Sequence, residues 1–173
     1  MRRIIALLVA IIISVNVPNT RVVAASSRSQ LAHRAVVRPP IAPSPLPDRS
    51  VIDRLVFETP LSEFRRERSR ARRLNRWLIT ASDGCTAPVV GSRGKSFDFR
   101  LACERHDLAY ANYASLSRLG LGVTWDAALR ARVDDQFQRD LQQSCITRRH
   151  SERLRCDGWA VVFFHAVRVA AGP

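Results

Sequence analysis

A histidine and several acidic side chains occur in this chain at a spacing that suits catalysis. Residues 103–107 read CERHD, and a second short string, SDGC, stands upstream at residues 82–85. Histidine is the natural general base near neutral pH, and a carboxylate on a second element would fix its tautomer. Asp134 and Asp135, in the string RVDDQF, could each supply that carboxylate. His106 is therefore the first candidate for a catalytic residue.

The segment around His106 has the spacing of one long helix. Apolar and aromatic residues recur along it at steps of four, three, four and three: Phe99, Cys103, His106, Tyr110 and Tyr113. Such spacing places them on one helix face. A histidine on such a face is more often a packed core residue than a catalyst, so this helix alone leaves both interpretations open.

Asp107 and the SDGC string indicate a site for a divalent cation. Asp107 follows His106 directly and projects about 100° around the helix from it. Asp83 begins a glycine-containing loop that a Cys85–Cys103 disulfide would hold against the start of the helix. Two carboxylates and a backbone carbonyl, such as that of Gly84, make the hard oxygen site that calcium prefers. The D-x-D-x-D-G loop of an EF-hand is absent from the sequence.

The N-terminus has the layout of a secretory signal peptide over residues 1–25. MRR precedes an apolar run, and small residues suited to cleavage follow in VVAAS. The run is too short to span a bilayer comfortably, which takes about 20 apolar residues, and an uncleaved anchor is the alternative. We predict a secreted, extracellular protein with cleavage near Ala24 or Ala25.

An even number of cysteines in an exported chain indicates disulfides. Four cysteines allow three pairings, and the sequence alone does not choose among them. We predict the local pairing, Cys85–Cys103 with Cys145–Cys156, which closes two loops of moderate size. A zinc site is the alternative, and the absence of a short CxxC spacing argues against it.

Composition divides the rest of the chain into a linker and a helical domain. Residues 26–50 hold five of the nine prolines without a periodic apolar pattern, which predicts a Pro-rich disordered linker. In residues 51–173 the apolar spacing is helical, and no alternating strand pattern of any length occurs. The predicted fold class is mainly α: a small disulfide-stabilised helical domain in which two long antiparallel helices carry the active site.

Helical patterns begin near residues 49, 61, 99 and 124. Asp48 is expected to cap the first, which Pro60 ends. Leu74 and Leu78 are expected in the buried stripe of the second, and Thr124 is expected to cap the fourth. Residues 146–155 are expected to form a basic turn, and the final string GWAVVFFHAVRVAA is apolar enough to predict a largely buried helix.

A net charge of +13 favours anionic partners. Arginines cover the polar side of segment 61–76, and each basic residue near an anionic lipid surface contributes about 1 kcal/mol. We therefore expect a monomer that contacts a phospholipid membrane or micelle surface, anionic in character, through four residues: Arg65, Arg66, Arg70 and Arg73. A solvated surface helix is the alternative. Nucleic-acid binding is not expected, because aromatic residues are not interleaved with the arginines.

Taken together, these strings resemble the secreted phospholipase A2 family of bacteria and fungi. The likeness rests on SDGCTAP, FDFRLACERHDLAYANY, RVDDQFQRDLQQSC and the closing aromatic helix, in that order. The single cysteine before the His-Asp pair fits the microbial branch better than the animal enzymes. The Arg-rich segment 61–76 has no counterpart, and residues 117–128 match poorly.

The resemblance implies a calcium-dependent hydrolase that cleaves the sn-2 ester of glycerophospholipids to lysophospholipid and fatty acid. His106 would activate a water molecule, Asp134 would orient the imidazole, and Tyr110 would support them. The ligands of Ca²⁺ would be Asp83, the Gly84 carbonyl and Asp107. A catalytically silent membrane-surface binding module of the same fold is the alternative function.

Overall fold

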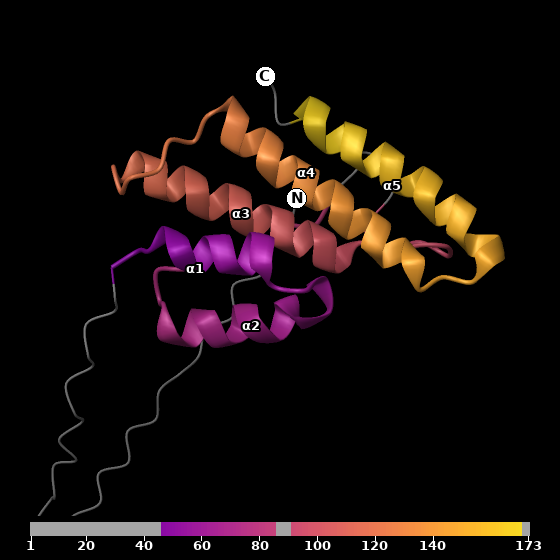
Figure 1. Cartoon of the computed structure of the whole chain (residues 1–173), viewed down its shortest axis with the longest axis horizontal. Helices are drawn as coiled ribbons and strands as arrows, with labels where there is room; N and C mark the ends of the chain where they lie inside the picture. Colours follow the sequence, from indigo (N-terminus) through magenta and orange to yellow (C-terminus); the bar gives the residue numbers. More distant parts are fainter. Residues whose placement is uncertain (1–45, 86–90, 171–173) are drawn as a thin grey trace, which may run out of the picture. The chain divides into compact units, whose positions relative to one another are not determined.

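A computed structural model of the chain describes residues 46–85 and 91–170 (Figure 1). The signal peptide predicted for residues 1–25 and the linker predicted for residues 26–50, apart from its last five residues, lie outside this part. The described residues form five α-helices and one π-helical segment, and no strand occurs among them. This confirms the mainly α fold class. None of the described helices has the length and apolarity needed to cross a membrane.

The N-terminal elements form a hairpin. Helix α1 (Arg49–Asp53) continues directly into the π-helical segment η1 (Arg54–Glu58), and α2 (Leu61–Leu74) follows. Asp48 caps α1 as predicted, because its carboxylate accepts the backbone N–H of Ser50 at 2.8 Å. Pro60 lies at the reversal between η1 and α2, where a missing backbone N–H costs nothing.

The predicted apolar stripe of α2 is only partly correct. Phe64 is fully buried, but Leu74 is 65% exposed. The helix ends at Leu74, and Asn75 leaves the helical conformation, so the side chain of the last residue no longer faces the core. Leu78 is buried as expected, although it lies beyond the helix.

Two long antiparallel helices, α3 (Arg100–Arg118) and α4 (Ala127–Ile146), pack side by side (Figure 1). The N-terminal hairpin packs on α3, and α5 (His150–Ala170) packs on α4. The predicted disulfides are both present, Cys85–Cys103 and Cys145–Cys156. All four cysteines lie in a core cluster with Phe99, Phe137 and Phe163. The disulfides therefore tie the loop before α3 and the start of α5 to the helix pair.

Three local predictions were wrong. Asp126, not Thr124, caps α4, because its carboxylate accepts the N–H of Leu129 at 2.9 Å. The basic turn is shorter than residues 146–155, since three residues suffice to reverse the chain before α5 begins at His150. Helix α5 is not largely buried, because only one of its faces packs on α4; the exposed apolar residues include Val161, Val162 and Val169.

A buried ion pair joins the hairpin to α3 and α4. Arg105 is 2% exposed and donates to the carbonyl oxygens of Val56 at 3.2 Å and Thr59 at 2.8 Å. Its guanidinium also lies 3.4 Å from Oδ1 of Asp140 and 5.0 Å from the centre of the Phe64 ring. Burial raises the pKa of Asp140 to about 6, although the charge of Arg105 acts in the opposite direction.

The raised pKa of Asp140 predicts a pH-dependent stability. The folded protein holds this proton more tightly than the unfolded chain does, so the contribution of Asp140 to stability is full below the unfolded pKa and is lost as pH rises through about 6. Relative to Asp140→Asn, the wild type should lose roughly 2–3 kcal/mol of unfolding free energy between pH of about 4 and 7. Urea unfolding followed by circular dichroism at several pH values measures both curves.

The measurements on wild type and Asp140→Asn include a control at the acid end of the pH range. At the acid end of the range the carboxyl group and the amide are both neutral, so the difference measured there is the effect of the substitution itself. Curves for the two proteins that run parallel across the range would contradict the prediction.

Candidate active site

His106 of α3 and Asp134 of α4 form a hydrogen-bonded pair. Nε2 of His106 lies 2.9 Å from Oδ1 of Asp134. The two residues are 8% and 3% exposed, so the contact is shielded from solvent. An ionised carboxylate can only accept, and therefore Nε2 carries the proton and Nδ1 is left as the basic nitrogen.

The antiparallel packing of α3 and α4 selects between the two neighbouring aspartates. Asp134 follows the buried Val133 and lies on the side of α4 that faces α3. The side chain of Asp135 is 56% exposed and makes its contact with Arg168 at the surface. Only Asp134 can therefore orient the imidazole.

Tyr110 holds the same carboxylate oxygen. It lies one helical turn after His106, and its hydroxyl donates to Oδ1 of Asp134 at 2.8 Å. Its ring lies 4.3 Å from the imidazole, centre to centre, and meets the edge of the Trp125 ring at 4.8 Å. Burial, followed by the hydrogen bond to Asp134, raises the pKa of Tyr110, so the phenol remains a donor at neutral pH.

Two residues that contact Tyr110 or Asp134 were not predicted from the sequence. Trp125 packs on Tyr110 from residues 117–128, which match the resembled family poorly. Arg168, in the last turn of α5, has Nη1 3.7 Å from Oδ2 of Asp134. Neither residue belongs to a local sequence motif, and their positions depend on how α4 and α5 pack.

Residues 79–85, the loop that carries Asp83 and Gly84, are fastened to α3 at both ends. Asn112, 2% exposed, donates from Nδ2 to the carbonyl of Ile79 at 2.7 Å and accepts the N–H of Ile79 at 2.9 Å. The Cys85–Cys103 disulfide fixes the other end. The sequence predicted the disulfide but not the contact of Asn112, because Asn112 lies between apolar residues of the helix and belongs to no sequence motif.

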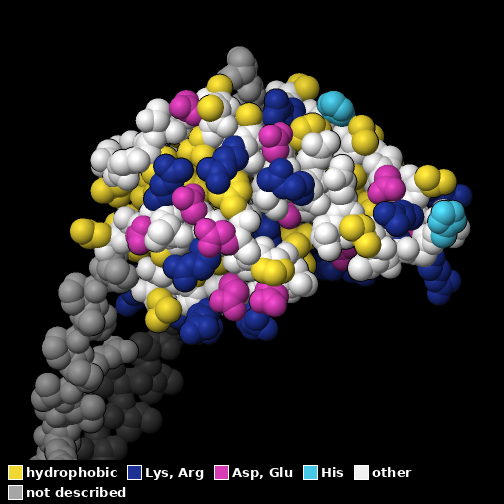
Figure 2. Space-filling view, in the orientation of Figure 1, with side chains coloured by type: hydrophobic (Ala, Val, Ile, Leu, Met, Phe, Trp, Pro, Cys, Tyr) yellow, Lys and Arg dark blue, Asp and Glu magenta, His cyan; other side chains and the backbone are white. Residues whose placement is uncertain are grey.

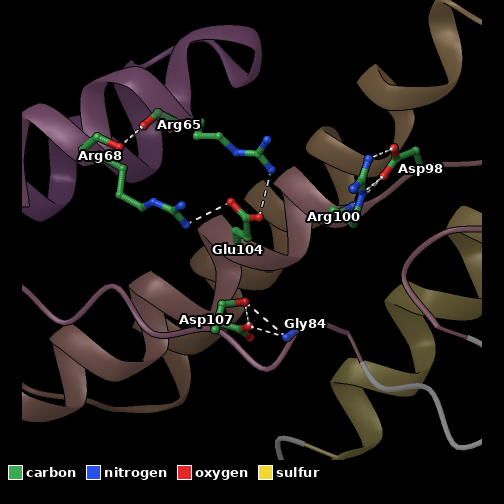
Figure 3. Close-up of polar contacts among 9 residues, drawn as sticks. Arg65, Arg68, Gly84, Asp98, Arg100, Glu104 and Asp107 are labelled. Atoms are coloured by element: carbon green, nitrogen blue, oxygen red, sulfur yellow. Dashed lines mark hydrogen bonds and ion pairs between the residues drawn. The ribbon is translucent and has the colours of Figure 1, made fainter.

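Asp107 is oriented by that loop (Figure 3). Its Oδ2 accepts the hydroxyl of Ser82 at 2.5 Å and the N–H of Gly84 at 3.3 Å. Gly84 has φ of +75°, a left-handed conformation that favours glycine. Burial raises the pKa of Asp107, the hydrogen bond from Ser82 lowers it, and the charge of Asp83 raises it.

The donor set of this loop fits a hard divalent cation. Asp83 and Asp107 line one hollow together with Ser82 and Tyr110, and the charge of Asp83 disfavours ionisation of Asp107. A cation between them would relieve that repulsion. In the described part of the chain, no group of three or more His, Cys, Asp or Glu side chains could hold a metal. Backbone carbonyls, such as that of Gly84, and water would therefore complete the shell, as calcium accepts.

A larger cavity lies apart from these residues. It has a volume of about 660 Å³ and lies between η1, the start of α3 and the second half of α4, with Arg105 and Asp140 in its wall. His106, Asp107 and Asp134 do not line it. We place the candidate site at the smaller hollow because Asp83 and Asp107, the carboxylates that could hold a cation, line it together with Tyr110, and Tyr110 shares Asp134 with His106.

The predicted membrane-contact arginines share one helix. Arg65, Arg66, Arg70 and Arg73 all lie on α2 and are exposed. Figure 2 shows basic and acidic side chains intermixed over one face of the molecule rather than a single basic patch. Arg65 is paired with Glu104 at 3.0 Å, so its charge is partly neutralised.

Comparisons with known proteins identify the family to which the chain is similar. A family model described as prokaryotic phospholipase A2 matches residues 52–171. A secretory phospholipase A2 of the fungus Beauveria bassiana is 33% identical over 126 residues, which cover 73% of this chain and 60% of that protein. A secretory phospholipase A2 of Arthroderma benhamiae is 32% identical over 123 residues, covering 69% of this chain and 76% of that protein. The chain thus spans less than two thirds of the first relative.

Ser82 and Asp83 should move the pKa of Asp107 in opposite directions. In calcium-free buffer, Ser82→Ala removes a hydrogen bond that lowers this pKa, so the pKa should rise. Asp83→Asn removes a charge that raises it, so the pKa should fall. The carboxyl ¹³C shift of Asp107, followed by NMR across a pH titration, measures both changes. Shifts of the same sign in the two variants would refute this electrostatic description of the loop.

Proposed function

The chain belongs to the prokaryotic phospholipase A2 family, and from this premise we propose that it is a calcium-dependent phospholipase A2. Its reaction would be hydrolysis of the sn-2 ester of glycerophospholipids to lysophospholipid and fatty acid. The observation that carries the proposal is the contact of 2.9 Å between His106 Nε2 and Asp134 Oδ1. That contact leaves Nδ1 of His106 as the basic nitrogen. Asp107, which the cation-binding loop orients, is the next residue in the sequence.

His106 acts as the general base. Nδ1 takes a proton from a water molecule as the water oxygen attacks the ester carbonyl. The imidazolium that forms is stabilised by Asp134 and returns the proton to the departing alkoxide of the lysophospholipid. None of the four cysteines is available as a nucleophile, because all are in disulfides. In the proposed reaction the attacking water supplies the new carboxylate oxygen.

Neighbouring side chains hold Asp134 in place for this role. Tyr110 donates to Oδ1, the oxygen that also accepts from His106. Arg168 lies near the other oxygen, Oδ2. Because both carboxylate oxygens have partners, the carboxylate cannot rotate away from the imidazole without losing contacts.

Asp83, the Gly84 carbonyl and Asp107 would hold Ca²⁺. When bound, the ion supplies positive charge that polarises the ester carbonyl and stabilises the oxyanion. Ser82 and the N–H of Gly84 fix the orientation of the Asp107 carboxylate. Asn112 and the Cys85–Cys103 disulfide keep the loop against α3, so the ligands are positioned before an ion arrives.

We also propose that the protein is secreted and acts on anionic phospholipid surfaces. Both relatives are named secretory, and two disulfides suit an oxidising compartment. The exposed arginines of α2 would supply attraction to such a surface.

Removing the base or its partner should strongly reduce hydrolysis. His106→Gln should lower kcat/KM by about 10³-fold or more, and Asp134→Asn by about 10²-fold, because the first removes the proton acceptor and the second its orientation. Fatty acid release from phospholipid vesicles, with the cleaved position identified by mass spectrometry, measures the loss. Asp135→Asn, next in sequence and exposed, is the matched control and should retain activity. Lipid binding by the wild type without any product would instead favour the silent membrane-binding module.

Calcium should bind at the loop whether or not substrate is present. Millimolar Ca²⁺ should raise the Tm of the wild type, since a ligand that binds only the folded state stabilises it. Asp107→Asn should abolish that shift, and Asp157→Asn on α5 should keep it. Thermal unfolding with calcium and with chelator gives the comparison. Hydrolysis that persists in chelator, together with an absent Tm shift, would overturn the calcium dependence.

A further inference from the structure

A second groove adjoins the hollow of the candidate active site. It has a volume of about 330 Å³ and shares Ser82 and Asp83 with the hollow that contains Asp107 and Tyr110. We call it the headgroup groove and define it by Arg68, Ser82, Asp83, Ser92, Arg100 and Glu104. A molecule that occupies the hollow can therefore extend into the groove across the same loop.

Arg68 of α2 is held in the wall of the groove (Figure 3). Its Nη1 lies 2.9 Å from Oε2 of Glu104, and its guanidinium carbon lies 5.5 Å from the centre of the Phe64 ring. The side chain is 18% exposed, so it is already ordered. A guanidinium has five N–H donors, and the contact with Glu104 leaves several of them for a ligand.

Arg100 of α3 is fixed on another wall. Nε donates to Oδ1 of Asp98 at 2.9 Å, and Nη2 donates to Oδ2 at 2.6 Å. This two-pronged contact orients the guanidinium plane (Figure 3). Its side chain remains 47% exposed, so an incoming anion can reach the remaining N–H groups.

The positive charge of the groove lies on its α2 side. The lining itself holds two guanidinium groups, of Arg68 and Arg100, and two carboxylates, of Asp83 and Glu104. Asp98 neutralises Arg100, and Glu104 is shared between Arg65 and Arg68, so that trio keeps one positive charge. Asp83 belongs to the proposed calcium site, where a bound ion would offset its charge, and a ligand then meets the excess guanidinium group of α2.

We propose that the headgroup groove binds the headgroup of the phospholipid substrate, and that Arg68 and Arg100 select headgroups of net negative charge. This inference rests on the proposed function, because it takes the sn-2 ester to lie at Asp107. The phosphate of the same lipid is only a few bonds from that ester, so the headgroup can reach the adjoining groove. The ammonium of a choline headgroup would be repelled by the guanidinium groups, whereas a glycerol headgroup carries no such charge. Its hydroxyls can donate to Glu104.

Monomeric short-chain substrates test the selection apart from attraction to a membrane. We would compare kcat/KM on dihexanoyl phosphatidylglycerol and dihexanoyl phosphatidylcholine below their micelle concentrations. Arg68→Gln should lower the preference for phosphatidylglycerol by about tenfold, as for a charge-assisted hydrogen bond at a largely buried site. Arg100→Gln should lower it about threefold, because that side chain is more exposed.

Arg118→Gln is the matched control. Arg118 lies on the same helix as Arg100 and is exposed, but it does not line the groove. It should leave the preference unchanged on monomeric lipid. Arg100→Gln also guards against misfolding, since its exposed side chain contributes little to the core, and circular dichroism checks each variant. An equal loss on both lipids in folded Arg68→Gln and Arg100→Gln would overturn the inference.

A binding measurement separates failure of the groove from failure of the proposed function. If the wild type hydrolyses neither lipid, the proposed function fails, and NMR titration of the full chain with dihexanoyl phosphatidylglycerol still tests the groove. Saturable shifts at Ser82 and Ser92 that disappear in Arg100→Gln would support it. Inorganic phosphate that produces the same shifts with equal affinity would overturn the assignment to a lipid headgroup, because the groove would then recognise a bare anion.

Discussion

The hydrogen bond between His106 and Asp134 is the contact on which the rest of the site depends. It exists only because α3 and α4 run antiparallel and in contact, which brings together residues 28 positions apart in sequence. The Cys145–Cys156 disulfide and the aromatic cluster around Phe137 hold α4 and α5 against the start of α3. Arg105 attaches the N-terminal hairpin to the same pair. The scaffold therefore acts mainly to keep one carboxylate beside one imidazole.

The carboxylates of the site differ in their surroundings: Asp134 is buried between fixed partners, whereas Asp83 and Asp107 lie together at the cation-binding loop. Asp134 has partners on both oxygens, which suits a residue whose role is to stay still. Asp83 and Asp107 instead oppose each other at the rim of a hollow. This repulsion is the condition under which a divalent cation gains most from binding. His106, which pairs with Asp134, and Asp107, which lies at the cation-binding loop, are consecutive residues of α3.

The sequence predicted the parts of the fold and site that follow from local spacing. The steps from Phe99 to Tyr113 defined one face of α3, and four cysteines in an exported chain pointed to the disulfides. Spacing alone could not choose between Asp134 and Asp135, because it gives the phase of a helix and not the side on which its neighbour packs. The pairing of Arg105 with Asp140 and the clamp of Asn112 on Ile79 were missed, since contacts between distant polar residues leave no periodic pattern. Apolar composition likewise overestimated the burial of α5, whose outer face has no neighbour in the described chain.

The tautomer of His106 shows directly whether Asp134 orients the imidazole as a general base. Selective ¹⁵N labelling of histidine, with two-dimensional NMR of the neutral ring in the wild type and in Asp134→Asn, identifies which ring nitrogen carries the proton. We expect a protonated Nε2 and a bare Nδ1 in the wild type. Replacement of Asp134 should weaken that preference. A wild-type ring protonated at Nδ1, or a tautomer unaffected by the substitution, would contradict it, because the nitrogen meant to accept the proton of water would then be occupied or would not be set by Asp134.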